Sequence, residues 1–422
     1  MRWKHLPIRC LGALALATAL GCGGHEVPYV IDSTYTISEP QFARTMGSLL
    51  GPPIIDGNAV TTLVNGDQIF PAMLEAVRGA QQTITFETFI YWSGEIGAEF
   101  THALTERARA GVKVHVIIDA VGGGKIDEEY IVAMRGAGVE FHLHKPLRWH
   151  EIRGSHKWNY RTHRKLLVTD GRIGFTGGVG IADEWSGNAH SPEHWRDTHY
   201  RVEGPVVGQL QAAFVDNWSE ATGVVLDGEE YFPRLEAAGP MRAQVFKSSA
   251  EGGNQSMQLM YLMTIAAARH NLRLATPYFV PDDRTVESLL EARRRGVKTQ
   301  LIVPGSLIDV ETVRRASRAR WGPLLAAGVE ICEFQPTMFH AKLMITDDRW
   351  VSIGSANFDN RSFKLNDEAN LNVLDREFAA EQTRVFEDDL KRCKRITHER
   401  WLARPWREKL AERFASLLGS QL

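Results

Sequence analysis

One polar pattern occurs twice in this chain and constrains its fold more than any other feature. "HRKLLVTD" and "HAKLMITD" each place a His, a Lys two positions later and an Asp five positions after that, and their histidines lie 177 residues apart. The two sets are His163, Lys165 and Asp170, and His340, Lys342 and Asp347. One copy is compatible with three polar residues on a half-buried strand, but a second copy at the same spacing indicates an internal duplication.

The similarity between the two halves extends beyond the polar pattern. "TITFETF" matches "NLRLATP", and "RARAGVKVHVIID" matches "ARRRGVKTQLIVP". In each half, apolar residues at helical spacing, within 96–104 and 286–290, precede a Gly and then a β-branched run. Such a Gly is typical of a helix C-terminus, and the run is typical of a buried strand. Helices that alternate with apolar strands predict an α/β fold in which helices pack over a sheet.

The sequence divides into four predicted segments. Residues 1–21 are expected to form a signal segment and residues 22–54 an extended lead-in. The first α/β domain is assigned to 55–228, and the second, with a C-terminal helix, to 229–422. The boundary is placed near "LDGEEYFPRLEAAGP", where periodicity ends and Gly, Pro and charged residues accumulate.

The first residues have the composition of an export signal. Arg2, Lys4 and Arg9 are followed by "CLGALALATAL" and "GCGG", a run too short to span a bilayer. An uncleaved N-terminal anchor is the alternative. "ALGC" resembles a bacterial lipoprotein box, which predicts lipidation of Cys22, although Ala19 departs from the usual Leu. The protein is therefore expected to be exported, lipid-anchored and membrane-associated on the extracytoplasmic side.

Charge and cysteine content exclude some classes of function. Loss of the segment before Cys22 removes three basic residues and no acidic one, taking the formal charge from −2 to −5. A nucleic-acid partner usually requires a basic surplus, so none is expected, although a local basic groove stays open. Cys332 and Cys393 are too few and too far apart in sequence for a zinc site or a disulfide framework. They either pair with each other or remain as buried thiols.

The duplicated strand predicts a site for an anion. Alternation along a strand places His163 and Lys165 on one face, and His340 and Lys342 on the equivalent face. A buried His and Lys side by side are costly unless a charged group meets them, and the following "GFTGG" and "SIGSAN" offer backbone amides. Phosphate fits best. Across a duplicated site, one imidazole would attack phosphorus while the other protonates the leaving alcohol.

Other residues are candidates for supporting roles. The alignment of the halves matches "RDTHYRVEG" with "DEANLNVLD", so Asp197 and Glu368 are predicted to orient the histidines. A surface or salt-bridge role is the alternative for these carboxylates. Ser355 and Asn357 are predicted, with the lysines, to hold nonbridging phosphate oxygens. Asp170, like its counterpart in the second half, is expected to brace the turn after its strand.

These motifs resemble the paired HxKxxxxD motifs of the phospholipase D superfamily. The similarity runs from Ile55 to the C-terminus, and "ATPYFVPD", "HWRDTHYRVEGPVV" and "SFKLNDEANL" resemble the bacterial cardiolipin synthase branch. It implies two tandem domains, each a mixed sheet with helices on both faces, and an active site at their interface built from the six motif residues. It also implies transfer through a covalent phosphohistidine without a metal or other cofactor, with His163 as nucleophile and His340 as acid.

Two features depart from the family pattern. Gly180 stands where members often have an Asn after the first motif, whereas the second half keeps Asn357. Loss of one donor is expected to weaken phosphate binding by about 1–3 kcal/mol unless another group replaces it. Related synthases often carry N-terminal transmembrane helices, and this chain has the signal-like segment instead.

The expected function is a phosphatidyltransferase that makes cardiolipin from two phosphatidylglycerol molecules. The predicted partners are that phospholipid and a membrane surface, and a monomer suffices for one site because each half supplies one His. A hydrolytic phospholipase D that releases phosphatidic acid is the first alternative, and a nucleic-acid phosphodiesterase is the second.

Two flanking segments have compositions suited to lipid contact. "HKPLRWHEIRGSHKWNYRTHRK" before the first motif is expected either to cover the mouth of the site or to form a solvated loop. "RWLARPWREKLAERFASLLGSQL" at the C-terminus combines Trp, Phe and Leu with basic residues. It predicts either a helix docked on the domain or a helix at a membrane interface.

Overall fold

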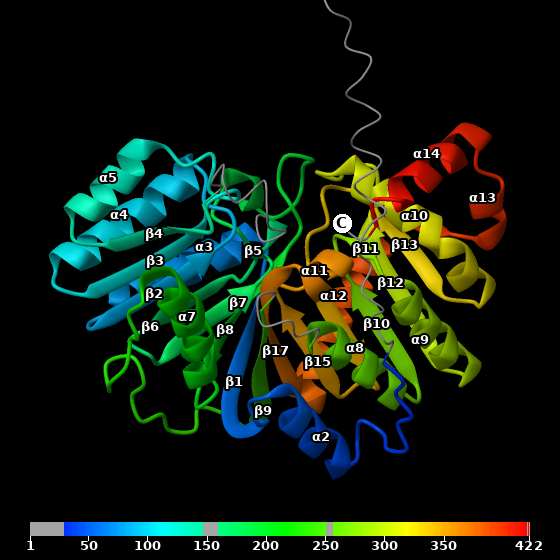
Figure 1. The fold of residues 1–422 in the computed structure, drawn as a ribbon, viewed down its shortest axis with the longest axis horizontal. Coiled ribbons are helices and arrows are strands. Elements are labelled where there is room, and N and C mark those ends of the chain that lie inside the picture. Colours follow the sequence, from blue (N-terminus) through cyan, green and yellow to red (C-terminus); the bar gives the residue numbers. More distant parts are fainter. Residues whose placement is uncertain (1–28, 147–158, 250–255, 420, 422) are drawn as a thin grey trace, which may run out of the picture. The chain divides into compact units, whose positions relative to one another are not determined.

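Both halves of the chain contribute to one mixed β-sheet, which forms the centre of the computed structural model (Figure 1). The structure describes residues 29–146, 159–249, 256–419 and 421. The predicted signal segment, Cys22 and most of the basic and aromatic stretch before the first motif lie outside the described residues. Residues 32–422 form one compact unit.

The strands repeat in the same order in the two halves. Those of the first half are β1 (Ile55–Val64), β2 (Thr83–Thr88), β3 (Lys113–Asp119), β4 (Glu140–His144), β5 (Arg161–Thr162), β6 (Leu166–Thr169), β7 (Ile173–Gly177) and β8 (Thr198–Glu203). Those of the second half are β9 (Met241–Ser248), β10 (Asn271–Ala275), β11 (Phe279–Val280), β12 (Lys298–Pro304), β13 (Glu330–Phe334), β14 (Leu343–Thr346), β15 (Trp350–Gly354), β16 (Phe358–Asp359), β17 (Asn366–Leu374) and β18 (Cys393–Ile396).

The sheet order confirms the internal duplication. The order β4-β3-β2-β6-β7-β8-β1 is mirrored by β13-β12-β10-β14-β15-β17-β9, and β18 is added at the outer edge beside β13. In each half, three parallel strands continue into antiparallel ones, as at β2 and β6 and at β10 and β14. The halves join where β9 runs antiparallel to both β1 and β17. The predicted mixed α/β architecture is therefore confirmed, and the two sheets are continuous rather than separate.

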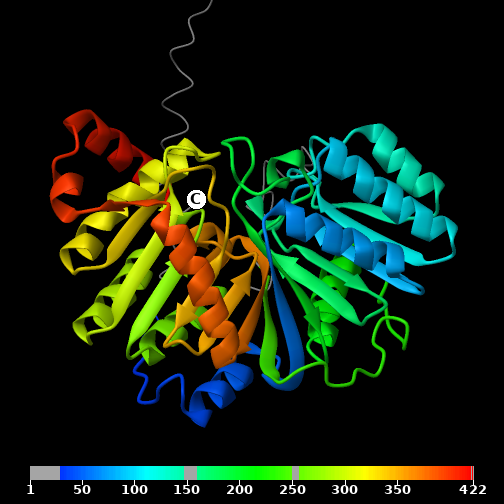
Figure 2. The same cartoon turned by 180° about the vertical axis from the view of Figure 1, so that it is seen from behind.

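Helices cover both faces of this sheet (Figures 1 and 2). Before the middle of the chain they are α2 (Pro40–Leu50), α3 (Gly66–Gly79), α4 (Glu95–Arg109), α5 (Glu128–Gly136), the short 3₁₀ helix η3 (Asp183–Trp185) and α7 (Val207–Thr222). After it they are α8 (Ser256–Ala267), α9 (Asp283–Arg294), α10 (Glu311–Ala326), α11 (Asn360–Lys364), α12 (Arg376–Lys391), α13 (His398–Leu402) and α14 (Trp406–Ser416). None of the helices within the described ranges is long and apolar enough to cross a bilayer.

Two equivalent helix ends explain the near-identical "GVK" turns. α4 and α9, the helices predicted from the apolar spacing, are each followed after one residue by a Gly, Gly111 and Gly296. The φ angles of these glycines are 92° and 88°, a left-handed conformation that costs glycine little. The chain then enters β3 and β12, so the same sequence signal produces the same helix-to-strand turn twice.

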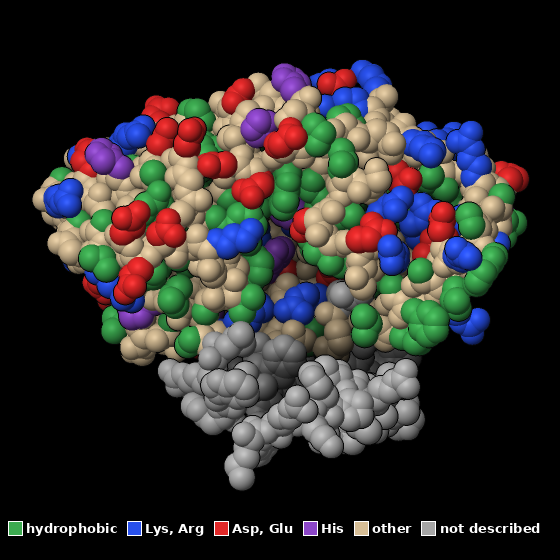
Figure 3. Space-filling view, turned by 90° about the horizontal axis from the view of Figure 1, so that it is seen from above, with side chains coloured by type: hydrophobic (Ala, Val, Ile, Leu, Met, Phe, Trp, Pro, Cys, Tyr) green, Lys and Arg blue, Asp and Glu red, His purple; other side chains and the backbone are tan. Residues whose placement is uncertain are grey.

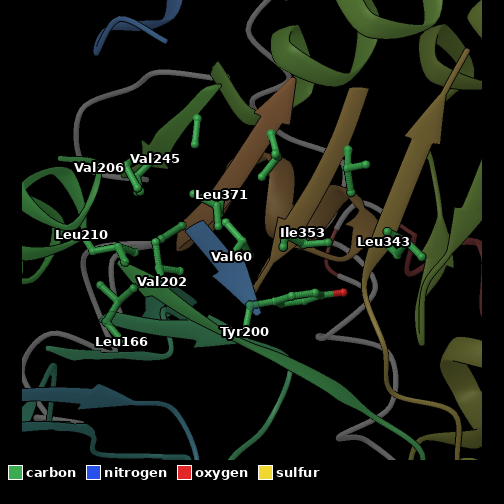
Figure 4. Close-up of a cluster of buried hydrophobic side chains, with 14 of the residues drawn as sticks. Val60, Leu166, Tyr200, Val202, Val206, Leu210, Val245, Leu343, Ile353 and Leu371 are labelled. Atoms are coloured by element: carbon green, nitrogen blue, oxygen red, sulfur yellow. The ribbon is translucent and has the colours of Figure 1, made fainter. Parts of the chain in front are cut away.

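A continuous apolar core crosses the junction of the halves. Val60, Val202, Val245 and Leu371 belong to one buried cluster, which also contains residues of α7 and α12 (Figure 4). Burial of each such side chain stabilises the fold by about 1.5–3 kcal/mol. This shared core explains why residues 32–422 form a single unit rather than two loosely joined domains.

The predicted lead-in contains a helix, and the predicted domain boundary falls in a connection between two elements. The prediction of an extended lead-in is wrong for Pro40–Leu50, which forms α2. Phe42, Met46 and Leu50 recur every fourth residue and are buried, and the ring of Phe42 packs edge-on against Trp350 with 5.0 Å between centroids. The boundary at residue 228 falls in the connection between α7 and β9.

Candidate active site

The two motif histidines lie at the seam between the halves. His163 lies three residues before the start of β6, and His340 occupies the equivalent position before β14. Both are buried, with 8 % and 5 % of their surface exposed. Figure 3 looks from above into a central hollow in which His side chains and Lys or Arg side chains are visible. The structure therefore brings together two residues that are far apart in the sequence.

The backbone of each histidine is held by the opposite half of the chain. The amide of His163 donates to the carbonyl of Asp367 at 2.8 Å, beside the β5–β17 pairing. The amide of His340 donates to the carbonyl of Arg196, also at 2.8 Å. These equivalent contacts fix the positions of the two imidazoles relative to each other.

The side chain of each histidine is also oriented from the opposite half. Nδ1 of His163 lies 3.0 Å from both carboxylate oxygens of Glu368, and Nδ1 of His340 lies 2.7 Å from Oδ2 of Asp197. Both carboxylates are fully buried. A carboxylate at Nδ1 favours the tautomer in which Nδ1 carries the proton and Nε2 has a free lone pair. Each imidazole thus has the arrangement required of a nucleophile or a base.

The electrostatics of the site favour neutral imidazoles before an anion binds. Burial lowers the pKa of His163 to about 4, although Glu368 opposes this shift. Burial and the nearby Lys342 lower the pKa of His340 to about 4 as well. Burial opposes ionisation of Glu368, but His163 and Lys165 outweigh it and lower the pKa of Glu368 to about 2. The carboxylates therefore remain ionised.

The two lysines supply positive charge beside the histidines. Nζ of Lys165 donates to the carbonyl oxygen of His163 at 2.9 Å, and Nζ of Lys342 donates to that of His340 at 2.8 Å. Burial and the charge of Lys342 lower the pKa of Lys165 to about 7. Burial also lowers the pKa of Lys342 to about 8. Two ammonium groups that repel each other in a buried site would be stabilised by an anion such as a phosphodiester.

Ser355 does not lie where a phosphate-binding role requires, and this corrects its sequence assignment. Its hydroxyl donates to Oε2 of Glu368 at 2.5 Å and accepts from the amide of Ala369 at 3.0 Å. The side chain is fully buried, so it holds the carboxylate that orients His163. In contrast, Oδ1 of Asn357 has no hydrogen-bond partner among the described residues. The Asn357 side chain is therefore not tied to the orienting carboxylate as Ser355 is.

The first half replaces these groups with a tryptophan. Gly178 and Gly180 stand where Ser355 and Asn357 stand in the second half, and Nε1 of Trp185 donates to Oδ2 of Asp197 at 2.9 Å. The Trp185 indole thus does for Asp197 what a serine hydroxyl does for Glu368. A Cβ on Gly180 would lie 3.2 Å from the Trp185 ring and 2.7 Å from Cβ of Ile90. The missing Asn is explained by Ile90 and, less tightly, by the Trp185 ring, which together leave no room for a side chain.

Asp170 and Asp347 are not brought to the histidines, which corrects their grouping with the catalytic residues. Asp170 has a φ of 52° and accepts from the amides of Gln81, Gln82 and Thr83. Asp347 has a φ of 51° and accepts from the amides of the corresponding segment, Arg269, His270 and Asn271. Each carboxylate therefore braces the turn after its strand, as the turn interpretation expected.

Aromatic residues line the site, and sequence reasoning missed them. The ring centroid of Phe89 lies 5.3 Å from that of His163, and Trp185 and Trp195 lie 5.3 and 5.4 Å from that of His340. Trp195 directly precedes the "RD" of the matched segment, which was the available signal for it. Such apolar walls limit access of water to the imidazoles.

Acidic groups on the second-half side of the site were also missed. The Tyr278 hydroxyl donates to Oδ2 of Asp309 at 2.5 Å. Burial and the charge of Glu368 are among the causes that raise the pKa of Asp359 to about 7, and its carboxylate caps α11 through the amide of Ser362 at 2.7 Å. Their sequence signals, an Asp in a loop and an Asp before an Asn, are too common to have identified them.

One cluster outside the histidine site consists of residue types that commonly bind metal ions. Atoms of His144, Glu220 and Asp367 lie within 4.8 Å of one another. Nζ of Lys145 lies 2.7 Å from Asp367 and 3.6 Å from Glu220, so an ammonium group already supplies positive charge there. This contact gives the cluster a structural role, and no cofactor is assigned to it.

Comparisons with known proteins identify the family. Residues 261–390 match the family model described as "Cardiolipin synthase, PLD-like domain". Cardiolipin synthase 2 of Bacillus anthracis is 35 % identical over 363 residues, which cover 86 % of this chain and 70 % of that protein. The chain belongs to the cardiolipin synthase family. Cardiolipin synthase of Geobacillus kaustophilus is 33 % identical over 372 residues, covering 88 % of this chain and 74 % of that protein. The resemblance predicted from the motifs is confirmed, and the protein is an enzyme of the phospholipase D-type phosphatidyltransferase class.

Solved structures show the same fold at low sequence identity. Phosphatidylserine synthase from Haemophilus influenzae superposes with a TM-score of 0.69 at 14 % identity, covering 90 % of this chain and 100 % of that one. Polyphosphate kinase from Porphyromonas gingivalis gives a TM-score of 0.53 at 15 % identity, covering 94 % of this chain and 57 % of that one. These likenesses support the fold of the whole described chain.

Proposed function

We propose that the protein makes cardiolipin and glycerol from two phosphatidylglycerol molecules through a phosphatidyl-histidine intermediate. The observation that carries this proposal is the pair of crossed contacts, His163 with Glu368 and His340 with Asp197. Two imidazoles, each with its Nδ1 on a carboxylate, suit a displacement at phosphorus in two steps, and Nε2 of His340 lies 3.3 Å from Nζ of Lys342. Relatives named cardiolipin synthase support the choice of substrate and product.

In the first step, Nε2 of His163 attacks the phosphorus of one phosphatidylglycerol. The new N–P bond replaces the bond from phosphorus to the headgroup glycerol oxygen, and protonated His340 gives its proton to that oxygen. The pKa of His340 is low in the free enzyme because of burial and Lys342. The negative charge of the bound phosphodiester would raise the pKa of His340 and so favour its acid form.

In the second step, a headgroup hydroxyl of another phosphatidylglycerol attacks the phosphohistidine. His340 takes the proton from this hydroxyl, the N–P bond breaks and His163 leaves as neutral imidazole. The ammonium groups of Lys165 and Lys342 and the amide of Asn357 would hold the nonbridging oxygens. Assignment of the nucleophile to His163 follows the family order, because the site itself is nearly symmetric.

Phe89, Trp185 and Trp195 support transfer to an alcohol rather than to water. Their rings lie against the two imidazoles and reduce the volume open to solvent. A lipid hydroxyl can be delivered from the bilayer, whereas water would have to enter past these rings. The hydrolytic alternative shares the same first step and differs only in the acceptor.

The wider setting is part of the same proposal. The signal-like start and the "ALGC" sequence support export and lipidation at Cys22, which would place the site at the extracytoplasmic face of a membrane. Each half supplies one histidine, so one copy of the chain provides a complete site. Domain limits of 55–228 and 229–422 are proposed as the duplicated units.

The proposal is tested with the purified full-length protein and phosphatidylglycerol vesicles in the presence of a chelator, with lipid products measured by mass spectrometry. Cardiolipin and glycerol in equal amounts are expected. Phosphatidic acid alone would assign the protein to the hydrolases, and cleavage of DNA without any lipid product would favour the nucleic-acid alternative.

Variants of the two histidines test the intermediate. His163→Ala and His340→Ala should each abolish turnover, whereas exposed His270 offers a matched control, and His270→Ala should keep full activity. A phosphatidyl group on the unchanged protein, detected as intact mass at short reaction times, should be absent from His163→Ala. Full activity of either site variant would contradict the mechanism.

A further inference from the structure

The last long helix, α14, turns its apolar side chains away from the protein. Trp406, Phe414 and Leu417 are 68 %, 64 % and 74 % exposed, and Leu410 is 46 % exposed. At 100° per residue, these four side chains lie within one quadrant of the helix. Helices on the surface of a soluble domain normally direct such a stripe toward the core. We refer to Trp406, Leu410, Phe414 and Leu417 as the α14 face.

The opposite side of α14 is polar and is held down by buried ion pairs. Glu412 is 3 % exposed and accepts from Nε of Arg404 at 3.0 Å and from Nε of Arg318 at 2.8 Å. Glu408 lies 3.7 Å from Arg318, and Ala415 is buried beneath the helix. Charge-assisted hydrogen bonds therefore fix the helix in an inverted orientation, because removing Glu412 would leave the buried Arg404 guanidinium without an ion-pair partner among the described residues.

The charged side chains that flank the α14 face are basic. Arg407, Lys409 and Arg413 are exposed, and within the described ranges none of them forms an ion pair. Their positions flank the α14 face, whereas Glu412 is buried and Glu408, although exposed, pairs with Arg318 on the other side of the helix. An apolar stripe with an aromatic residue and basic neighbours matches the interface of a bilayer that contains anionic lipid. A purely apolar protein partner would not account for this segregation of charge.

The C-terminal end of α14 is tied to the loop that carries site residues. The carbonyl of Gly419 accepts from Nδ2 of Asn360 at 2.8 Å, and Asn360 follows Asn357 of the site by three positions. Ala415 packs in one cluster with Val280 of β11. In Figure 1, α14 lies at the top of the molecule, the side from which Figure 3 looks into the hollow. The helix α14 and the mouth of the site are therefore on the same side of the protein.

We infer that the α14 face docks on the surface of an anionic lipid bilayer and holds the mouth of the active site against it. This inference rests on the proposed function for the presence of a lipid substrate, but it assigns a separate surface with its own partner. Substrate headgroups would then reach the imidazoles without the lipid leaving the bilayer. The Trp406 ring and the basic side chains would lie at the headgroup level, and Phe414 and Leu417 would lie deeper.

The docking is tested by hydrogen–deuterium exchange of the full-length protein with phosphatidylglycerol vesicles, with phosphatidylcholine vesicles and without lipid. Amides of 406–419 should become protected with phosphatidylglycerol and much less with phosphatidylcholine. This readout is local, so it separates the α14 face from attachment through the N-terminal segment. Protection of these amides without vesicles that grows with protein concentration would identify a second copy as the occupant and overturn the inference. Binding of the protein to vesicles with unchanged exchange at 406–419 would also overturn it.

Paired variants make the test quantitative. Phe414→Ser with Leu417→Ser should lower vesicle affinity at least tenfold, and Lys409→Gln with Arg413→Gln should remove most of the preference for anionic lipid. Val225 is a matched control because it is 65 % exposed in the connection after α7, and Val225→Ser should bind vesicles normally.

Activity on a different substrate form separates this inference from the proposed function. On short-chain phosphatidylglycerol below its micelle concentration, the α14 variants should turn over like the unchanged protein, since the site is intact. Normal vesicle protection without cardiolipin formation would keep the docking and refute the proposed activity. Cardiolipin formation, together with unaltered vesicle affinity of the Phe414→Ser, Leu417→Ser variant, would keep the proposed activity and refute the docking.

Discussion

Nδ1 of His340, in the second half of the chain, lies 2.7 Å from Oδ2 of Asp197 in the first half. The equivalent contact runs the other way, from His163 to Glu368 at 3.0 Å. Neither half therefore contains a complete histidine–carboxylate pair. The duplicated fold has become one enzyme because each half completes the site of the other.

The orienting carboxylates lead to the first prediction. Asp197→Asn and Glu368→Gln preserve shape but remove the charge that favours a proton on Nδ1 and a lone pair on Nε2. Each should lower kcat by a factor on the order of 10²–10⁴, with a smaller change in KM. Steady-state kinetics on phosphatidylglycerol measure both constants, and thermal unfolding checks that the variants fold. Near-normal kcat in a folded variant would assign the carboxylate a structural role only.

The lysines predict how activity depends on pH. Burial and like charge lower the pKa of Lys165 to about 7, and burial lowers that of Lys342 to about 8. A lysine with a lowered pKa is charged below that value and neutral above it. The capacity to hold an anionic phosphate should therefore decline as pH rises through about 7 to 8. On the acidic side, protonation of His163 near pH 4 should remove the nucleophile.

The profile of kcat/KM against pH at constant ionic strength measures these groups in the free enzyme. Lys165→Arg is the informative variant, because its guanidinium stays charged throughout the range. If it retains measurable activity, its basic limb should move to higher pH. A flat profile from pH 6 to 9 in the unchanged enzyme would contradict a role for the lysine charges.

The tryptophan in the first half predicts a loss specific to Asp197. Trp185→Phe keeps an aromatic ring beside His340 but removes the indole N–H that donates to Asp197 at 2.9 Å. A hydrogen bond to a charged group contributes about 1.5–3 kcal/mol. If half or more of this free energy serves to orient His340 for catalysis, its loss should lower kcat about tenfold. Trp195→Phe serves as the control, since the indole N–H of Trp195 makes no such contact with the carboxylate among the described residues.

Gly180 allows the reverse experiment. Gly180→Asn would restore the residue that the family often has, yet a Cβ here would lie 2.7 Å from Cβ of Ile90. Crowding of this kind should lower the free energy of unfolding by about 1–3 kcal/mol. Chemical denaturation measures the change. Gly208→Asn is a useful comparison, because nothing lies within 4 Å of a Cβ at that position. Equal stability of the two variants would show that Ile90 and the Trp185 ring can move aside.

Local sequence signals predicted much of the fold. The repeated helix–Gly–strand segments specify α4 with β3 and α9 with β12, because a left-handed Gly ends each helix at the same point. They did not reveal that β1 and β9 join the two sheets, since the same pattern is compatible with two separate sheets. The apolar spacing of α2 was short enough to be overlooked, and its burial depends on the distant Trp350.

The sequence predicted which residues belong to the site better than it predicted which of them contact one another. Matching the halves selected Asp197 and Glu368, because duplication preserves the position of each residue in its own half. It could not show that each carboxylate meets the histidine of the other half, as this depends on how the halves pack. Ser355 was assigned to phosphate because a hydroxyl can bond either a phosphate or a carboxylate, and only the fold decides which one it meets.

The turn aspartates provide a final prediction, in which stability and catalysis should separate. Asp170→Ala removes an acceptor of amide hydrogens from Gln81, Gln82 and Thr83, in a residue whose φ of 52° favours Asp or Asn over Ala. The loss of the carboxylate should lower the free energy of unfolding by about 1–3 kcal/mol. Because the carboxylate bonds none of the site residues, the folded variant should keep kcat within a factor of about three, well short of the effect of losing a catalytic proton donor.

Asp347→Ala is the matched variant in the second half and should behave in the same way, because its carboxylate accepts from Arg269, His270 and Asn271. Denaturant unfolding and kcat, measured on the same preparations below the unfolding transition, test both. Loss of kcat by several orders of magnitude at unchanged stability would return these carboxylates to the catalytic group. Reduced stability with nearly normal kcat would establish that the last position of the repeated motif serves the turn, and that the histidines and lysines alone carry its chemistry.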